Sequence, residues 1–312
     1  MGQERRLPRR AGGVRLRDAV DVFKATITVE NTRSTYAAAL EKLVADFGAD
    51  TDVALLGEEP DRVSGWFTFV RGGKAAKTFN IRLTALGSAC EYWRAQGWLV
   101  GDPLVRLRAR PAPPDTSKAL SKSRVTEILG SDAPLRDRVL WHMLYESSAR
   151  AEEVLNLNVP DLDTVNRCAV VTRKGGAREV IAWQTGTARL LPRMLTGRRA
   201  GPLFLTDRRA RPTVAAGDID PKTGRARLSY RRAAELFETH TAHYDDGPYV
   251  LHQLRHSRLT HAAEDGASTP VLMKLSGQTS VRSLAKYARL SDEGLRRYQA
   301  DSDPAARRRP GR

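Results

Sequence analysis

Apolar residues in the N-terminal third of the chain recur every three to four residues, which is the spacing of amphipathic α-helices. The first predicted helix runs from Leu16 to Phe23. The second runs from Thr32 to Phe47, with Asn31 and Thr32 as caps and Gly48 ending it. Two more helices are predicted over Asp61–Phe69 and Lys77–Gln96, so this region should form a small helical bundle.

A proline-rich segment, Arg110–Lys118, separates this bundle from the rest of the chain. Its three prolines and few apolar residues are typical of a stiff, extended linker. The predicted organisation is therefore two domains between basic ends: a basic arm 1–13, a helical domain 14–109, the linker 110–118, a second domain 119–299 and an Arg-rich tail 300–312.

The second domain combines helical periodicity with one β-like region. Two segments, Cys168–Val171 and Glu179–Trp183, flank Lys174-Gly175-Gly176 and predict a β-hairpin with a lysine at its turn. Residues 204–228 are rich in Gly, Pro, Asp and Arg, so a long loop is expected there. The predicted fold class is mainly α with a small antiparallel β-hairpin. Its helices in this domain are Ser121–Leu129, Leu135–Ser147, Thr185–Met194, Ser229–Tyr244, Leu251–Asp265, Pro270–Leu275 and Ser280–Ala288.

The charge balance of the chain indicates a partner. There are 52 Lys and Arg against 36 Asp and Glu, a formal net charge of +16, and the sequence pI is about 10.3. A chain with this excess typically binds a polyanion, because each phosphate that it neutralises releases condensed counterions. The alternative is a basic surface without a nucleic-acid partner.

The two cysteines, Cys90 and Cys168, lie far apart without metal-ligand spacing. We therefore expect a reducing, cytoplasmic location, with neither a disulfide framework nor a metal site. The basic N-terminal residues are not followed by the apolar run of a signal peptide, and no apolar stretch reaches the roughly 20 residues of a membrane-spanning helix. No membrane association is predicted.

A short motif in the second domain contains residue types that act on phosphate. In His252-Gln253-Leu254-Arg255-His256, a helix would place His252, Arg255 and His256 on one face. A guanidinium there can fork onto a phosphate, and an imidazole can move a proton near neutral pH. The alternative is a buried histidine pair with a structural arginine.

Three further residues each have an ordinary structural alternative when taken alone. Arg150 is expected at the start of a new helix, where backbone N–H groups also attract anions, or it is simply a solvated arginine. Lys174 would project from the hairpin turn, as many exposed lysines do. Tyr287 lies in an amphipathic segment typical of core residues, and its phenol, with an ordinary pKa of about 10, needs activation to attack phosphorus.

Taken together, these segments resemble the tyrosine recombinase (phage integrase) family. Four motifs are matched in order: the first arginine box by SSARAEEVLNL, the hairpin lysine by TRKGGAREV, the His-x-x-Arg box by HQLRH and the nucleophile segment by LSGQTSVRSLAKYARLS. The helical core-binding domain of the family is similar to NTRSTYAAALEKLVADF and to the stretch from Thr78 into the linker. The resemblance covers roughly residues 14–299.

The resemblance implies a two-domain DNA clamp, made of a helical SAM-like core-binding domain and an integrase-type catalytic domain. Tyr287 would attack the scissile phosphate and form a 3′-phosphotyrosyl intermediate, while Arg150 and Arg255 stabilise the added negative charge. Lys174 would protonate the leaving 5′-oxygen, and His252 would accept the tyrosine proton or hold the phosphate. The two guanidiniums would take the part that metal ions play elsewhere, so no cofactor and no metal is expected.

One position departs from the family pattern. Gln278 stands nine residues before Tyr287, where the family usually has a histidine or, in some members, a tryptophan. An amide can donate a hydrogen bond to a phosphate oxygen but cannot carry a charge or a proton, so slower catalysis or a shifted pH dependence would follow. Glu153 and His256 are predicted to orient Arg150 and the face that carries His252, with ordinary helix residues as the alternative.

The implied partner is double-stranded DNA, bound by a homotetramer and assisted by accessory DNA-bending or directionality proteins. Residues Ser291–Gln299 could pass to a neighbouring subunit, and the Arg-rich tail could add non-specific affinity. Arg231 and Arg232, at the start of a predicted helix, are either DNA contacts or solvated charges.

Three functions are compatible with these residues. The first is a site-specific recombinase that integrates, excises or resolves DNA. The second is a catalytically impaired DNA-binding protein of the same fold, suggested by Gln278 and the predicted long loop. The third is an enzyme of the same chemistry that relaxes DNA or resolves telomeres. Tyr298 is the one nearby alternative to Tyr287 as nucleophile, and its surroundings lack the family pattern.

Overall fold

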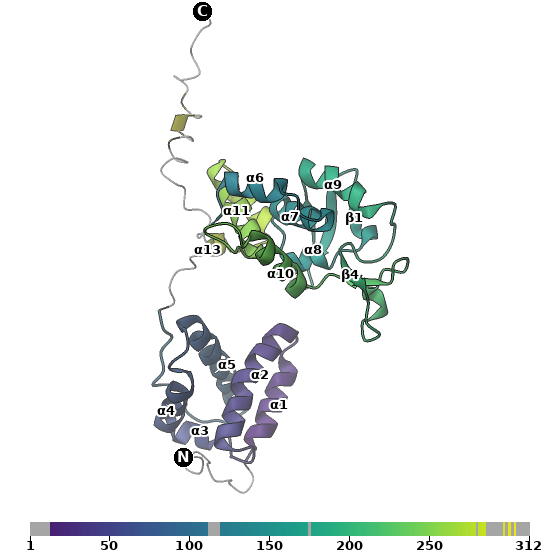
Figure 1. Ribbon diagram of the computed structural model, residues 1–312. Helices are drawn as coiled ribbons and strands as arrows, with labels where there is room; N and C mark the ends of the chain where they lie inside the picture. Colours follow the sequence, from purple (N-terminus) through teal and green to yellow (C-terminus); the bar gives the residue numbers. More distant parts are fainter. Residues whose placement is uncertain are drawn as a thin grey trace, which may run out of the picture. The chain divides into compact units, whose positions relative to one another are not determined.

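A computed structural model describes residues 13–111, 119–173, 176–278, 280–284, 296, 299–300 and 303 of the chain (Figure 1). Its contacts divide the chain into two compact units, between Thr116 and Ser117. Within the described residues, no helix combines the length and the apolar character that crossing a membrane requires.

The first unit is a helical bundle. Its helices are α1 (Leu16–Thr26), α2 (Glu30–Phe47), α3 (Leu55–Glu58), α4 (Pro60–Arg71) and α5 (Ala76–Ala95). Helices α1, α2 and α5 pack against one another around a buried core. Trp93 is fully buried in that core, and its indole N–H donates to the Ala19 carbonyl at 3.0 Å, which ties α5 to α1.

The second helix begins earlier than predicted. Asn31 and Thr32 lie inside α2, and its N-cap residue is Val29. The Arg33 guanidinium donates two hydrogen bonds to the Ile27 carbonyl, at 3.0 and 2.8 Å. A side chain from inside the helix thus provides a hydrogen-bond partner for a backbone carbonyl of the segment that precedes it. The predicted capping by Asn31 or Thr32 is therefore wrong, since both lie inside the helix and the N-cap residue Val29 makes no side-chain cap hydrogen bond.

The second unit is built around α7 (Leu135–Ser147), whose boundaries are those predicted. Trp141 and Met143 are almost completely buried, and α7 contacts every neighbouring helix from α6 to α11. A helix that is covered on all sides forms the centre of a core. The neighbours are α6 (Lys122–Gly130), α8 (Ala151–Leu155), α9 (Thr185–Leu195), α10 (Tyr230–Thr241) and α11 (Leu251–Glu264), with α12 (Thr269–Ser276) and α13 (Val281–Leu284) following α11.

A three-stranded antiparallel sheet lies beside these helices, in the order β1 (Leu162–Asp163), β2 (Cys168–Thr172), β3 (Arg178–Ala182). The predicted hairpin is β2–β3, with Cys168 opposite Ala182 and Thr172 opposite Arg178. The Arg173 amide donates to the Ala177 carbonyl at 2.8 Å and closes the turn. The predicted fold class, mainly α with small antiparallel β structure, is confirmed.

Residues 204–228 are not the predicted loop. Strands β4 (Leu205–Arg209) and β5 (Arg225–Arg227) pair antiparallel, and a short 3-10 helix, Ala216–Asp218, lies between them. The loop-like composition misled the prediction because the polar residues make the turn itself: the Asp220 carboxylate accepts hydrogen bonds from the amide and hydroxyl of Thr223, at 2.8 and 2.7 Å. We call residues 205–227 the β4–β5 arm; it projects from one side of the second unit (Figure 1).

Candidate active site

Arg150 follows a sharp reversal of the chain between α7 and α8. Ser148 has a left-handed backbone conformation, with φ of 54°. The Ser147 hydroxyl donates to the Met143 carbonyl at 2.6 Å and accepts from the Ala149 amide at 3.1 Å. These contacts stabilise the turn and place Arg150 as the N-cap residue of the five-residue helix α8.

Glu153 holds Arg150 through two hydrogen bonds. Its Oε2 accepts from the Arg150 amide at 2.9 Å, and its Oε1 accepts from the Arg150 Nη1 at 2.8 Å. The Glu153 side chain is 5% exposed and that of Arg150 is 42% exposed, so a buried carboxylate positions a partly open guanidinium. The Arg150 amide is taken by Glu153, so it does not attract an anion as the sequence suggested.

Arg255 is held by backbone carbonyls from two other segments. It lies on α11 with an exposure of 3%. Its Nη1 donates to the Ser148 carbonyl and its Nη2 to the Ser276 carbonyl, the latter at 2.6 Å. Both carbonyls are neutral, so they orient the guanidinium without cancelling its charge.

Arg150, His252 and Arg255 line one pocket of about 250 Å³. His252 is exposed and stands one helical turn before the buried Arg255, on the shared face that the spacing predicted. The structure therefore gathers two guanidiniums and one imidazole, from α8 and α11, around a space suited to an anionic group. The other lining residues are Leu144, Ala149, Ala151, Glu152, Tyr230 and Leu251.

Gln278 is not among the residues that line this pocket. It follows Gly277, whose φ of 56° is the left-handed C-cap conformation of α12. The Gln278 Oε1 is buried and has no hydrogen-bond partner within the described part of the chain. The side-chain oxygen of Gln278 is therefore enclosed by protein and does not face the pocket of Arg150 and Arg255.

Arg173 is a site residue that the sequence reasoning missed. It is 6% exposed; its Nη1 lies 3.0 Å from Glu153 Oε2 and its Nε 3.3 Å from Glu179 Oε2. Its guanidinium also packs on Gly277, where a Cβ would lie 2.2 Å from the Arg173 Cζ. Ala169 and Val171 on β2 are buried, so continuing the strand's alternation by two residues was the signal that Arg173 points inward.

The remaining predicted residues are spread more widely. His256 is 8% exposed, and its Nδ1 lies 3.3 Å from Thr260 Oγ1 on the same helix. Arg231 and Arg232 both bond to Glu235, at 3.2 and 3.3 Å, and these hydrogen bonds from Arg232 and Arg231 hold the pKa of Glu235 below its usual range. Neither arginine lines the pocket of Arg150. Lys174, Tyr287 and Tyr298 lie outside the described residues.

Known proteins resemble this chain in sequence and in fold. The model of the phage integrase family matches residues 118–293, more than half of the chain. The tyrosine recombinase XerC of Mycobacterium bovis (strain BCG / Pasteur 1173P2) is 29% identical over 291 residues, which covers 88% of this chain and 93% of the relative. The tyrosine recombinase XerC of Mycobacterium leprae is 27% identical over 300 residues, with 89% and 94% covered.

Two solved integrases have a similar fold. The Tn1549 transposon integrase in complex with circular intermediate DNA has a TM-score of 0.66 at 14% identity, covering 92% of this chain and 99% of the other. A lambda integrase dimer bound to a COC′ core site also has a TM-score of 0.66 at 14% identity, with 90% and 96% covered. The chain belongs to the phage integrase family. It is a tyrosine-type site-specific DNA recombinase.

Proposed function

We propose that Tyr287 is the nucleophile that attacks DNA and that the pocket of Arg150, His252 and Arg255 holds the scissile phosphate. The main support for this proposal is that Arg150 and Arg255 line the same pocket, although they lie in distant segments of the sequence. Attack by a phenol oxygen on the phosphate adds negative charge to its non-bridging oxygens. Two oriented guanidiniums stabilise that charge without having to reorganise during the reaction.

The covalent steps balance without a cofactor. The Tyr287 oxygen forms a bond to phosphorus, and the bond from phosphorus to the 5′-oxygen breaks. His252 takes the phenol proton or holds the phosphate, and Lys174 gives a proton to the departing 5′-oxygen. The 5′-hydroxyl of a second strand later attacks the phosphotyrosine and releases Tyr287, so the energy of the phosphodiester is conserved.

The positioning groups act on these residues. Glu153 fixes the Arg150 guanidinium through its 2.8 Å contact, as its place in the motif suggested. Gln278 would offer its amide N–H to a phosphate oxygen. His256, buried on α11 one residue after Arg255, would support the helix face that carries His252.

The proposal extends to the partner and the assembly. Two integrases of this fold were solved with DNA bound, and we place double-stranded DNA on this chain. The first unit would act as the core-binding domain and the second as the catalytic domain of a DNA clamp, with Arg231 and Arg232 at the DNA. We further propose a homotetramer, aided by accessory DNA-bending proteins, that acts in the cytoplasm.

The test begins with the DNA site. Genomic fragments that the protein binds and cleaves are selected and sequenced, and a nicked suicide substrate is made from the site they share. Denaturing gels should then show a covalent protein–DNA adduct for the wild type and for Tyr298→Phe, and none for Tyr287→Phe. An adduct that persists in Tyr287→Phe and disappears in Tyr298→Phe would assign the nucleophile to Tyr298 instead.

The buried Gln278 Oε1 favours a second candidate function, a DNA-binding protein with impaired catalysis. This candidate predicts specific binding to the selected site without an adduct on any substrate. Appearance of an adduct in Gln278→His, under conditions where the wild type forms none, would support it.

A further inference from the structure

We propose that the β4–β5 arm carries a second phosphate-binding site, which holds the DNA backbone beside the scissile phosphate. This inference rests on the proposed function, because it uses DNA as the ligand. The site is a pocket of about 500 Å³ between the arm and the start of α10. Arg208 and Arg211 from the arm and Arg232 from α10 line it.

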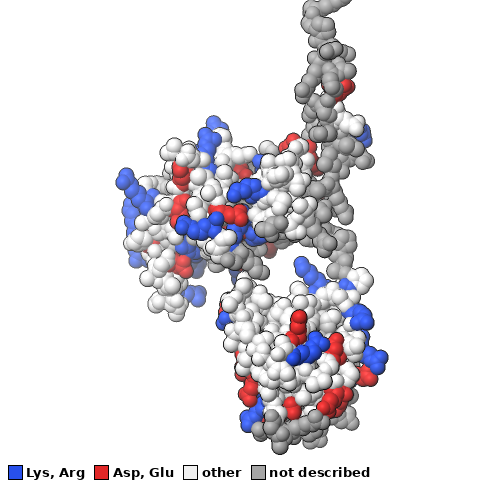
Figure 2. Space-filling view, turned by 180° about the vertical axis from the view of Figure 1, so that it is seen from behind, with Lys and Arg blue, Asp and Glu red and all other residues white. Residues whose placement is uncertain are grey.

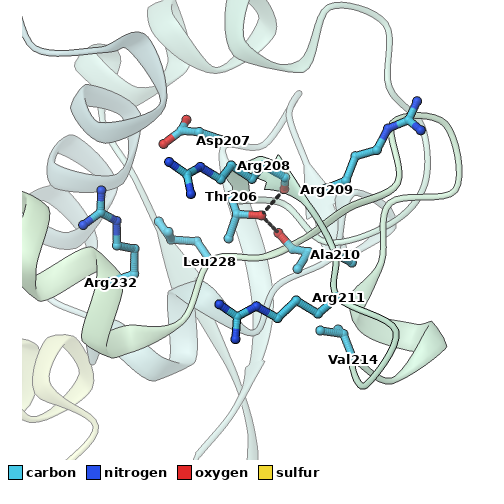
Figure 3. Close-up of a pocket in the computed structure, with 10 residues that line it drawn as sticks. Thr206, Asp207, Arg208, Arg209, Ala210, Arg211, Val214, Leu228 and Arg232 are labelled. Carbon is cyan, nitrogen blue, oxygen red and sulfur yellow. Dashed lines mark hydrogen bonds between the residues drawn. The ribbon is translucent and has the colours of Figure 1, made fainter.

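The side chains of these arginines converge on one space (Figure 3). Arg208, Arg211 and Arg232 point toward the gap between the arm and α10, whereas the Arg209 side chain points in the opposite direction. Arg208 and Arg211 are exposed to solvent. Arg232 also pairs with Glu235 at 3.3 Å, so Arg208 and Arg211 supply the charge of the site and Arg232 adds a third guanidinium beside them. An anion with several oxygen atoms fits such a site.

Each carboxylate of the arm, including that of Asp207 in the lining of the pocket, is paired with an arginine. Asp207 bonds to Arg136 at 2.7 Å, Asp218 to Arg227 at 2.7 Å, and Asp220 to Arg198 at 3.3 Å. The arm has six basic and three acidic residues, so these pairs leave an excess of positive charge. Neither Arg208 nor Arg211 pairs with a carboxylate among the residues that the structure describes, and a ligand would have to supply the negative charge.

The pairing of β4 with β5 is irregular around Arg208. Leu205 lies opposite Arg227 and Arg209 lies opposite Arg225, so β4 uses more residues than β5 between these two pairs. The Thr206 hydroxyl donates to the carbonyls of Arg208 and Ala226, at 2.8 and 3.2 Å, and stabilises this irregular stretch (Figure 3). An irregularity held by its own hydrogen bonds is a built feature of the strand pair.

A third pocket adjoins both the arm pocket and the active-site pocket, and we call the three pockets together the groove. The third pocket, of about 350 Å³, shares Glu152 and Tyr230 with the active-site pocket and Val214 and Leu228 with the arm pocket. The root of the arm is also fixed to α8, because the Arg227 Nη1 donates to the carbonyls of Leu155 and Leu157, both at 3.0 Å. Arg150 lies at the other end of that short helix.

The shape and charge of the groove select the occupant. A single small anion would fill only one of three connected pockets, whereas a DNA strand presents a phosphate at every nucleotide along its path. Lys and Arg side chains gather at the edge of the second unit that carries the arm, at the left of Figure 2. A duplex held at Arg150 and Arg255 would therefore lay its neighbouring phosphates at Arg208 and Arg211.

The experiment measures binding rather than cleavage. The full chain is titrated onto a fluorescent random-sequence duplex about three helical turns (roughly 30 base pairs) long, over a range of salt concentrations. The double variant Arg208→Gln/Arg211→Gln should bind about tenfold more weakly, and the slope of log K against log salt should flatten by about two, since each phosphate contact contributes about 0.9. Arg208→Lys/Arg211→Lys should keep the wild-type slope, because it keeps the charges.

The control removes the same charge outside the groove. Arg189 and Arg193 are exposed on α9 and line none of the three pockets. Arg189→Gln/Arg193→Gln should change the slope much less. Equal slopes for the two Gln variants, or a wild-type slope for the arm variant, would overturn the proposal. A thermal melt identical to the wild type shows that each variant is folded.

The two proposals fail separately. Binding to random-sequence DNA does not depend on Tyr287. An adduct that persists in Tyr287→Phe, together with a flattened salt slope in the arm variant, would overturn the nucleophile assignment alone. A normal adduct together with an unchanged slope would overturn the arm site alone.

Discussion

The active-site pocket and the arm pocket belong to one groove, yet they hold their arginines in opposite ways. Arg255 is 3% exposed and fixed by the carbonyls of Ser148 and Ser276. Arg208 and Arg211 are exposed, and within the described residues no carboxylate pairs with them. A guanidinium that is already oriented can stabilise a transition state without reorganising. An exposed guanidinium favours binding to the DNA backbone, because neutralising a phosphate releases condensed counterions. The partners of a guanidinium, more than its place in the groove, indicate what it does.

The carboxylates of the two regions also differ in which arginines they pair with. Glu153 is buried and shared by Arg150 and Arg173, so it orients the Arg150 guanidinium that lines the active-site pocket. In the arm, Asp207, Asp218 and Asp220 pair with Arg136, Arg227 and Arg198, and none of them pairs with Arg208 or Arg211 among the described residues. Buried acids in the first region therefore position cations, and acids in the second leave cations available.

The largest effect is expected at Arg255. Arg255→Gln should slow single-turnover cleavage of the selected site by about a hundred- to a thousandfold, because one fixed donor to the developing charge is lost. The salt dependence of binding should change little, in contrast to the arm variant. Quench-flow cleavage and anisotropy titrations measure the two quantities. If Arg255→Gln flattened the salt slope and left the cleavage rate unchanged, the two pockets would not differ in function.

An intermediate effect is expected at Arg173, which touches Glu153, Glu179 and Gly277. Arg173→Met should slow cleavage about tenfold and lower the melting temperature, because breaking a buried pair costs about 3–5 kcal/mol. If Arg173 acts by positioning the hairpin that carries Lys174, a substrate with a bridging 5′-sulfur should restore the rate, since a thiolate leaves without a proton.

The matched control for this variant is Arg178→Met, on the same hairpin. Arg178 is exposed at the start of β3. Its loss should leave both the rate and the melting temperature close to the wild type. A slow Arg173→Met that the sulfur substrate does not rescue would argue against an effect through Lys174 and for one through Arg150.

The smallest effect on catalysis is expected at Glu146, a buried acid outside the groove. Burial alone would raise the pKa of Glu146, but hydrogen bonds from His142, Thr187 and Gln184 outweigh it and hold the pKa below its usual range. Glu146→Gln should destabilise the fold by about 1–3 kcal/mol at neutral pH, because charge-assisted hydrogen bonds are lost, and leave cleavage unchanged.

The pH dependence of this loss follows from the lowered pKa. A carboxyl with a depressed folded-state pKa contributes its stability above the unfolded pKa of about 4.3, and loses it as the pH falls through the folded value. Urea titrations of wild type and Glu146→Gln should therefore differ most above that pH and converge in acid. A difference that grows in acid would show that the carboxylate is not stabilised by these bonds.

The sequence by itself determined most of the helices, the β2–β3 hairpin and the family. The boundaries of α7, Leu135–Ser147, follow from apolar spacing because helical periodicity is a local property. The order of the four motifs identified the family, and the shared face of His252 and Arg255 needed no more than a helix.

Only the tertiary structure decided which charged residues are buried and which are free. Arg173 and Arg208 are both arginines in β-rich segments, yet one is enclosed by Glu153 and Glu179 and the other faces solvent. The sequence did not predict the β4–β5 arm for the same reason. Its residue Arg227 donates to carbonyls that lie some 70 residues away in the chain. Burial and pairing depend on contacts between distant segments, which local periodicity does not encode.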